Sequence, residues 1–183
     1  MSVPRRILLP LLLALAVVGL GMVAAGCGSG GDETHVTEGQ VLKLGELKYT
    51  VTFSRYLNPN DSEDVDYLTG QAEPQKERAY FGVFFEVQNK SEQTQQLVSE
   101  MVITDEEGTE YKALPSESLF AFPFGGKVES QEQIPTLDSA AQQGPIQGSV
   151  VIFELTDEAS ANRPLTLHLE NSEGDKGEVQ LDL

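Results

Sequence analysis

"FGVFFEVQ", residues 81–88, alternates between two sets of side chains, and this alternation indicates the fold. One set consists of Phe81, Val83, Phe85 and Val87, and the other of Gly82, Phe84, Glu86 and Gln88. Successive side chains of a β-strand point to opposite faces of its sheet. The pattern therefore predicts a strand whose first set lies in the core and whose second set, Phe84 included, faces water.

The same period of two recurs along the chain. In residues 47–54 the apolar set is Leu47, Tyr49, Val51 and Phe53, and residues 165–170 and 179–183 alternate in the same way. Residues 95–104 and 148–155 fit strands less cleanly, and short strands are expected at 40–44 and 109–112. Turn-rich segments at 89–92, 105–108 and 171–177 separate them, and only residues 156–162 could make a helical turn. Seven to eight such strands predict an all-β, antiparallel sandwich.

Two connections are too long for simple turns. Residues 58–78 are acidic and contain proline, and residues 113–146 are mixed, with one plausible strand near 125–134. Loops of this length in a compact domain are usually functional or disordered.

The N-terminal segment has the plan of an export signal. Arg5 and Arg6 precede an apolar run over residues 7–25, and "AAGC" at 24–27 resembles the lipobox of bacterial lipoproteins. The resemblance implies cleavage before Cys27 and lipid attachment to its thiol; an uncleaved membrane helix is the alternative. The predicted organisation is a lipoprotein signal peptide at 1–26, a lipidated flexible tether at 27–39 and the sandwich domain at 40–183.

The chain is strongly acidic, with a formal charge of −17. Cleavage after residue 26 would remove Arg5 and Arg6 and no acid, which takes the charge to −19. Such a surface repels phosphates, so nucleic-acid binding is not expected. The acidity is explained either by solubility near an anionic envelope or by cation binding.

Strand direction places the 58–78 loop and the 105–108 turn at one end of the sandwich. The acidic residues expected there are Asp61, Glu63, Asp64, Asp66, Asp105, Glu106 and Glu107. They form either a solvated cap or a calcium site, since calcium takes six to eight oxygen ligands. The loop is not an EF-hand, because Glu63 stands where that motif needs glycine.

Residues 118–126, "SLFAFPFGG", carry Leu119, Phe120, Phe122 and Phe124. They are expected either to cap the core or to form an exposed surface for a partner. The chain's two histidines do not suggest catalysis or zinc binding, because His35 falls in the tether and His168 on the polar face of its strand.

Three stretches resemble a family of bacterial secreted lipoproteins. They are "VLKLGELKYTVTFSRYL", the segment 79–111, and "GPIQGSVVIFEL" followed by "NRPLTLHLE". This family has an immunoglobulin-like domain of unknown function and is related to the mycobacterial immunoprotective extracellular antigen. The resemblance implies an immunoglobulin-like sandwich and an address at the cell envelope, and it brings no activity.

The sequence thus favours a non-enzymatic, monomeric binding or structural module without a cofactor. It would be exported and lipid-anchored through Cys27 to the outer face of the bacterial cytoplasmic membrane. Its partner would be an envelope protein or ligand. A calcium-binding lipoprotein is the alternative, and an envelope hydrolase ranks last.

Overall fold

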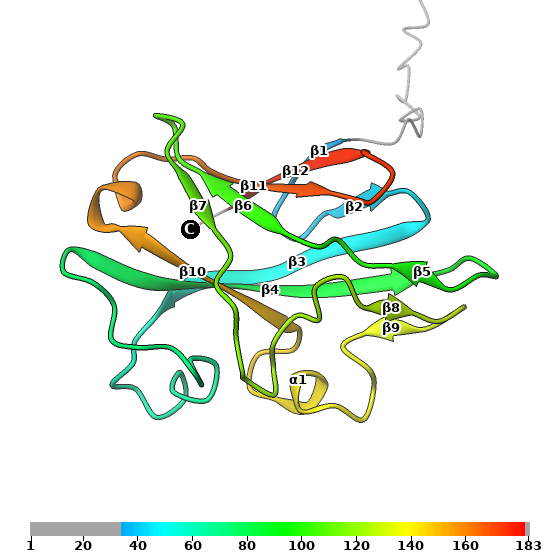
Figure 1. Ribbon diagram of the computed structural model, residues 1–183, viewed down its shortest axis with the longest axis horizontal. Helices are drawn as coiled ribbons and strands as arrows, with labels where there is room; N and C mark the ends of the chain where they lie inside the picture. Colours follow the sequence, from blue (N-terminus) through cyan, green and yellow to red (C-terminus); the bar gives the residue numbers. More distant parts are fainter. Residues whose placement is uncertain (1–33, 182–183) are drawn as a thin grey trace, which may run out of the picture. The chain divides into compact units, whose positions relative to one another are not determined.

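The computed structural model describes residues 34–181 of the chain as a β-sandwich (Figure 1). The predicted signal peptide, Cys27 and most of the predicted tether lie outside the described residues. No helix within residues 34–181 is long and apolar enough to cross a membrane.

Two facing sheets and a short ribbon make up the described chain. The first sheet has the order β1 (His35–Thr37), β12 (Lys176–Leu181), β11 (Leu165–Glu170), β6 (Met101–Thr104) and β7 (Glu110–Lys112). The second has the order β10 (Ser149–Thr156), β4 (Arg78–Asn89), β3 (Leu47–Leu57) and β2 (Val41–Leu44), and β9 (Gln133–Ile134) also pairs with β4. The ribbon consists of β5 (Gln95–Gln96) and β8 (Lys127–Val128). Neighbouring strands are antiparallel, apart from β1, which pairs in parallel with β12.

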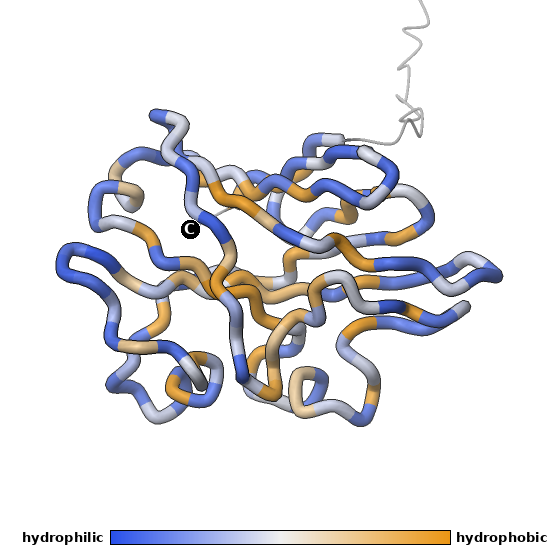
Figure 2. Tube along the Cα trace, in the orientation of Figure 1, coloured by the Kyte–Doolittle hydropathy of each residue, from blue (hydrophilic) through white to orange (hydrophobic). Residues whose placement is uncertain are grey.

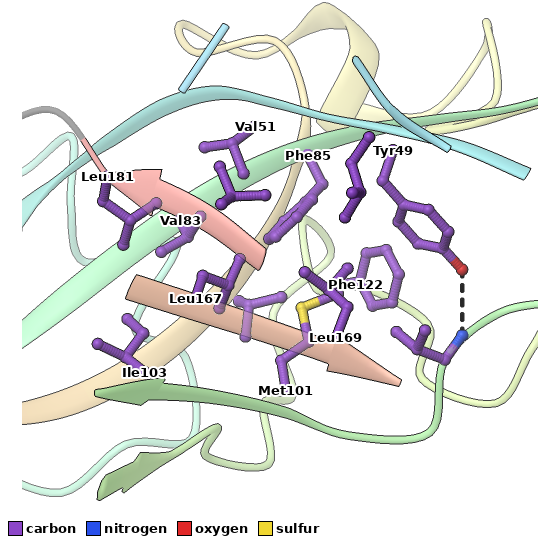
Figure 3. Packing of buried hydrophobic residues seen from close by; sticks show 14 of the residues in the cluster. Tyr49, Val51, Val83, Phe85, Met101, Ile103, Phe122, Leu167, Leu169 and Leu181 are labelled. Atoms are coloured by element: carbon purple, nitrogen blue, oxygen red, sulfur yellow. Dashed lines mark hydrogen bonds between the residues drawn. The ribbon is translucent and has the colours of Figure 1, made fainter. Parts of the chain in front are cut away.

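The main core fills the space between the two sheets (Figure 3). Phe81, Val83 and Phe85 of β4 pack in one cluster with Leu167 and Leu169 of β11. These are alternate positions of their strands, as the period of two predicts. The predicted all-β, antiparallel sandwich is confirmed.

Most of the predicted strands form close to their expected positions, and the helical turn within 156–162 is a 3-10 turn, Asp157–Ser160. The plausible strand near 125–134 is two strands, β8 and β9, which pair with β5 and β4. Helix α1 (Ala140–Gln143) is not predicted by the sequence, because four residues are too few to give a hydrophobic stripe.

Residues 95–104 are not one strand, as their composition suggested, but the separate strands β5 and β6. Between them Leu97 and Val98 turn into the core. The backbone N–H of Val98 donates a hydrogen bond of 3.2 Å to the hydroxyl of Tyr49 (Figure 3). Burial raises the pKa of Tyr49 to about 12, so this hydroxyl stays protonated. Adjacent residues of a regular strand point to opposite faces of the sheet. Leu97 and Val98 are both buried in the core, so the strand is interrupted at this point.

The sandwich begins earlier than residue 40, inside the range predicted as tether. His35–Thr37 form β1, and Val36 lies opposite Val179 of β12. Val36 is only 6% exposed and belongs to the main core. The burial of Val36, which stabilises by roughly 1.5–3 kcal/mol, acts together with the β1–β12 ladder to dock this short polar segment.

The outer face of the second sheet is covered by a loop layer, which we define as residues 58–77, 113–121 and 140–148 (Figures 1 and 2). Leu57, Tyr67, Leu68, Tyr80, Phe84, Val150 and Ile152 form a second buried cluster there, with Leu114, Phe120 and Ile146 packed against it. Phe84 is fully buried, so the prediction that it faces water is wrong. The period of two gave its face correctly but could not show that the long loops cover that face.

Candidate functional site

A β-bulge in β3 determines which side chains reach the loop layer. The pairing of β3 with β4 shifts between Val51 and Phe53, so one extra residue is accommodated there. A one-residue shift moves every following side chain to the opposite face of the sheet. Ser54 consequently points inward and is buried, whereas Phe53 is 43% exposed on the outer face. The prediction that Phe53 lies in the core is wrong for this reason.

Tyr67 joins the loop layer to the sheet. Its ring meets Phe84 edge-on at 5.1 Å between centroids and meets Phe120 at 4.9 Å. The backbone N–H of Ile146 donates a 3.4 Å hydrogen bond to the Tyr67 hydroxyl. Contacts from three separate segments therefore converge on one buried ring and fix the layer in place.

The predicted aromatic stretch takes part in this packing and in the main core. Phe122 is buried, with its ring 5.6 Å from Phe85 and 5.1 Å from Phe124. Phe120 packs against the second cluster, and of the four apolar side chains named for this stretch only Leu119 projects into solvent, at 84% exposed. Of the two alternatives for this stretch, the structure favours the interior role over a partner surface.

Arg55 and Asp64 form an ion pair where the loop layer begins. The Asp64 side chain is only 3% exposed, and both of its oxygens accept hydrogen bonds from the guanidinium group of Arg55. The backbone N–H of Asn58 donates a further hydrogen bond of 2.7 Å to the same carboxylate. The hydrogen bonds that Arg55 donates to Asp64 raise the pKa of Arg55 above its usual range, so the guanidinium stays charged.

A surface depression of about 350 Å³ lies beside this ion pair. Its lining consists of Phe53, Arg55, Asp61, Glu63, Asp64, Tyr67, Pro145 and Ile146. The bulge supplies Phe53 and Arg55, and the loop layer supplies the rest. Of the residues predicted as cation ligands, the depression collects Asp61, Glu63 and Asp64. It is the candidate site because an exposed aromatic ring, apolar walls and charged groups meet there.

The predicted acidic end does not assemble as a metal site. The loop with Asp61, Glu63, Asp64 and Asp66 covers the second sheet, whereas the turn with Asp105, Glu106 and Glu107 belongs to the first (Figure 1). Within the described range, 34–181, no three histidine, cysteine or acidic side chains are grouped so that they could hold a metal ion. Strand direction predicts the end of the sandwich at which a loop lies, but not the face that it covers.

Asp105 binds the backbone of its own turn. One oxygen accepts hydrogen bonds from the N–H groups of Glu107 and Thr109, at 3.1 and 2.8 Å, and the other accepts from the hydroxyl of Tyr111 at 3.2 Å. Burial alone would raise the pKa of Asp105, but these donors outweigh it and leave the pKa below the usual range. The carboxylate is thus engaged in holding the turn.

A carboxyl group with a lowered pKa in the folded state stabilises the fold above its unfolded pKa of about 4. This contribution is lost as the pH falls through the folded pKa. We therefore expect Asp105→Asn to melt at a lower temperature than the wild type at about pH 7, with the difference shrinking towards about pH 2. Thermal melts across this range test the expectation, and a difference that stays constant with pH would contradict it.

Both histidines approach one carboxylate on the outer face of the first sheet. Nδ1 of His168 lies 3.4 Å from one oxygen of Glu178, and Nε2 of His35 lies 3.0 Å from the other. The remaining nitrogens face hydroxyls, Thr104 at 2.8 Å from His168 and Thr34 at 3.0 Å from His35. This network connects β1, β12, β11 and β6 across the sheet.

The order of hydroxyl, imidazole and carboxylate in Thr104, His168 and Glu178 is that of a hydrolase triad. A triad also needs backbone donors aimed at the developing oxyanion. Thr104 lies in β6, which is paired on both sides, by β11 and β7, so the ladders occupy the backbone N–H groups around it. The arrangement is better explained as a cross-strand polar network than as a catalytic site.

Comparison with known proteins supports the β-sandwich fold and indicates no activity. No family model and no curated protein matches the chain. Among solved structures, the yjhA protein from Bacillus subtilis aligns with a TM-score of 0.53 at 15% identity, covering 80% of this chain and 99% of its own. The secreted protein MPT63 from Mycobacterium tuberculosis aligns with a TM-score of 0.50 at 11% identity, covering 81% and 97%. A functionally unknown protein from Listeria monocytogenes aligns with a TM-score of 0.50 at 8% identity, covering 79% and 81%.

Proposed function

We propose that the protein is an exported, lipid-anchored, non-catalytic binding module of the bacterial cell envelope. The depression beside Arg55 and Asp64 is its binding site. Support for export comes from the signal-like N-terminus and from the likeness in fold to a secreted protein.

The observation that carries the binding role is the bulge that turns Phe53 outward. Bulges are common next to functional sites, where they re-aim a side chain. Without the shift, Phe53 would join the main core, and the depression would lose its exposed aromatic surface. The ring remains 43% exposed and lines the depression together with Tyr67, Pro145 and Ile146, which gives a ligand apolar surface to pack against.

Site-specific crosslinking in the native envelope tests this proposal. We expect a photoreactive phenylalanine analogue at Phe53 to give a discrete adduct that the same analogue at Glu173 does not give. Glu173 is a fitting control because it is exposed on the turn between β11 and β12, in the first sheet. Identical adducts from both positions, or none from Phe53, would contradict a binding role for the depression.

The lipid anchor makes a separate prediction. Cys27→Ala removes the thiol that the lipobox resemblance marks for acylation. We expect the variant to lose lipid attachment and to remain uncleaved, whereas the mature wild type should begin at Cys27 and carry acyl mass. Intact mass spectrometry of the membrane fraction measures both, and an unmodified Met1 terminus on the wild type would overturn the anchor.

A further inference from the structure

We propose that the depression binds a primary ammonium group carried on an alkyl stem; this inference rests on the proposed function. The depression is half-open to solvent and has a volume of about 350 Å³, near the lower end of the range for ligand pockets. That size suits a small amine or the end of one side chain.

The charges around the depression favour a cation. Asp61, Glu63 and Asp64 contribute three carboxylates, and Arg55 is the one cation among the described lining residues. Asp64 neutralises Arg55 through two hydrogen bonds, and a third donor bond of the guanidinium goes to the carbonyl of Tyr56 at 3.1 Å. The guanidinium is therefore engaged, and Asp61 and Glu63 leave the depression with net negative charge.

The walls favour an organic cation over a metal ion. Calcium requires six to eight oxygen ligands. Within residues 34–181, no three acidic, histidine or cysteine side chains lie close enough together to hold a metal ion. Phe53, Pro145 and Ile146 instead offer carbon surface next to the carboxylates. An alkyl stem can lie on this surface, and a cation close to the Phe53 ring gains a further attraction.

A primary ammonium group also suits the two exposed carboxylates. It carries three N–H donors and can give charge-assisted hydrogen bonds to Glu63 and to Oδ2 of Asp61. Oδ1 of Asp61 already accepts from the backbone N–H of Glu63 at 2.8 Å, which restrains that carboxylate.

The test titrates the folded protein with n-butylammonium while amide NMR signals of the depression are followed. We expect saturable shifts at Tyr67 and Ile146, with 1-butanol and butyrate at least about tenfold weaker because they lack the cation. Glu63→Gln should weaken butylammonium about two- to fivefold, as for an exposed ion pair, and Glu173→Gln should leave it unchanged. Phe53→Leu, which keeps an apolar side chain, should weaken it about threefold through loss of the ring.

Nα-acetyl-lysine amide distinguishes the source of the ammonium group. Tighter binding than butylammonium would assign the site to a lysine side chain of a partner, and weaker binding to a free amine. Equal binding of 1-butanol, or equal losses in Glu63→Gln and Glu173→Gln, would overturn the inference. A crosslinked adduct at Phe53 without amine binding would leave the binding module standing and remove only this ligand class.

Discussion

Phe84→Asp and Phe85→Asp are both expected to unfold the domain. The two neighbours point to opposite faces of β4, and both are fully buried. Phe85 lies in the main core and Phe84 in the second cluster beneath the loop layer. An unpaired carboxylate in either place has no hydrogen-bond partner, and its burial costs far more than a surface substitution.

Substitution by alanine is milder and allows the loss of folding stability to be estimated. Phe84→Ala and Phe85→Ala should each lower the free energy of unfolding by about 3–5 kcal/mol, a large part of the roughly 5–15 kcal/mol of a typical domain. Val41→Asp serves as the control, because Val41 is 54% exposed in β2 and should change stability by less than about 1 kcal/mol. Denaturant melts followed by far-ultraviolet dichroism measure all of these. A Phe84 variant that is as stable as Val41→Asp would show that the loop layer does not seal the outer face.

The sandwich could be predicted because each strand carries its own signal. Alternation along Phe81, Val83 and Phe85 marks a buried face, whatever the rest of the chain does. The loop layer carries a weaker signal, in that residues 80–85 are apolar on both faces apart from Gly82, as in strands buried on both sides. Tyr67 and Leu68, apolar residues within an acidic loop, are consistent with such a cover.

The site could not be predicted in the same way. The bulge after Val51 reverses the face of Phe53, and alternation over the preceding residues contains no sign of it. The pairing of Arg55 with Asp64 joins a strand to a loop nine residues later, among many acids that could equally have been its partner. Likewise, the approach of His35 to Glu178 depends on the docking of β1, in a segment whose composition predicts a tether.

Asp64→Ala is expected to be the most damaging single change at the site itself. The substitution leaves the Arg55 guanidinium without its partner and the N–H of Asn58 without its acceptor. Removal of one member of a buried ion pair costs about 3–5 kcal/mol. The Arg55 side chain is 30% exposed, so water can solvate part of it, and we expect the free energy of unfolding to fall by about 3 kcal/mol.

A double-mutant cycle separates the ion pair from the packing around it. Arg55→Met removes the charge but keeps an unbranched stem, and Asp64→Leu replaces the carboxylate by an apolar group. The double variant should be more stable than Asp64→Leu alone, because no unpaired charge remains, and a buried pair can often be replaced by apolar residues at little cost. Hydrogen exchange at residues 58–68 should rise in Asp64→Ala before exchange in β4 does, since the pair fixes the start of the loop layer. If instead the two single changes add without coupling, Arg55 and Asp64 act independently and the loop layer is held by its apolar packing and its other hydrogen bonds.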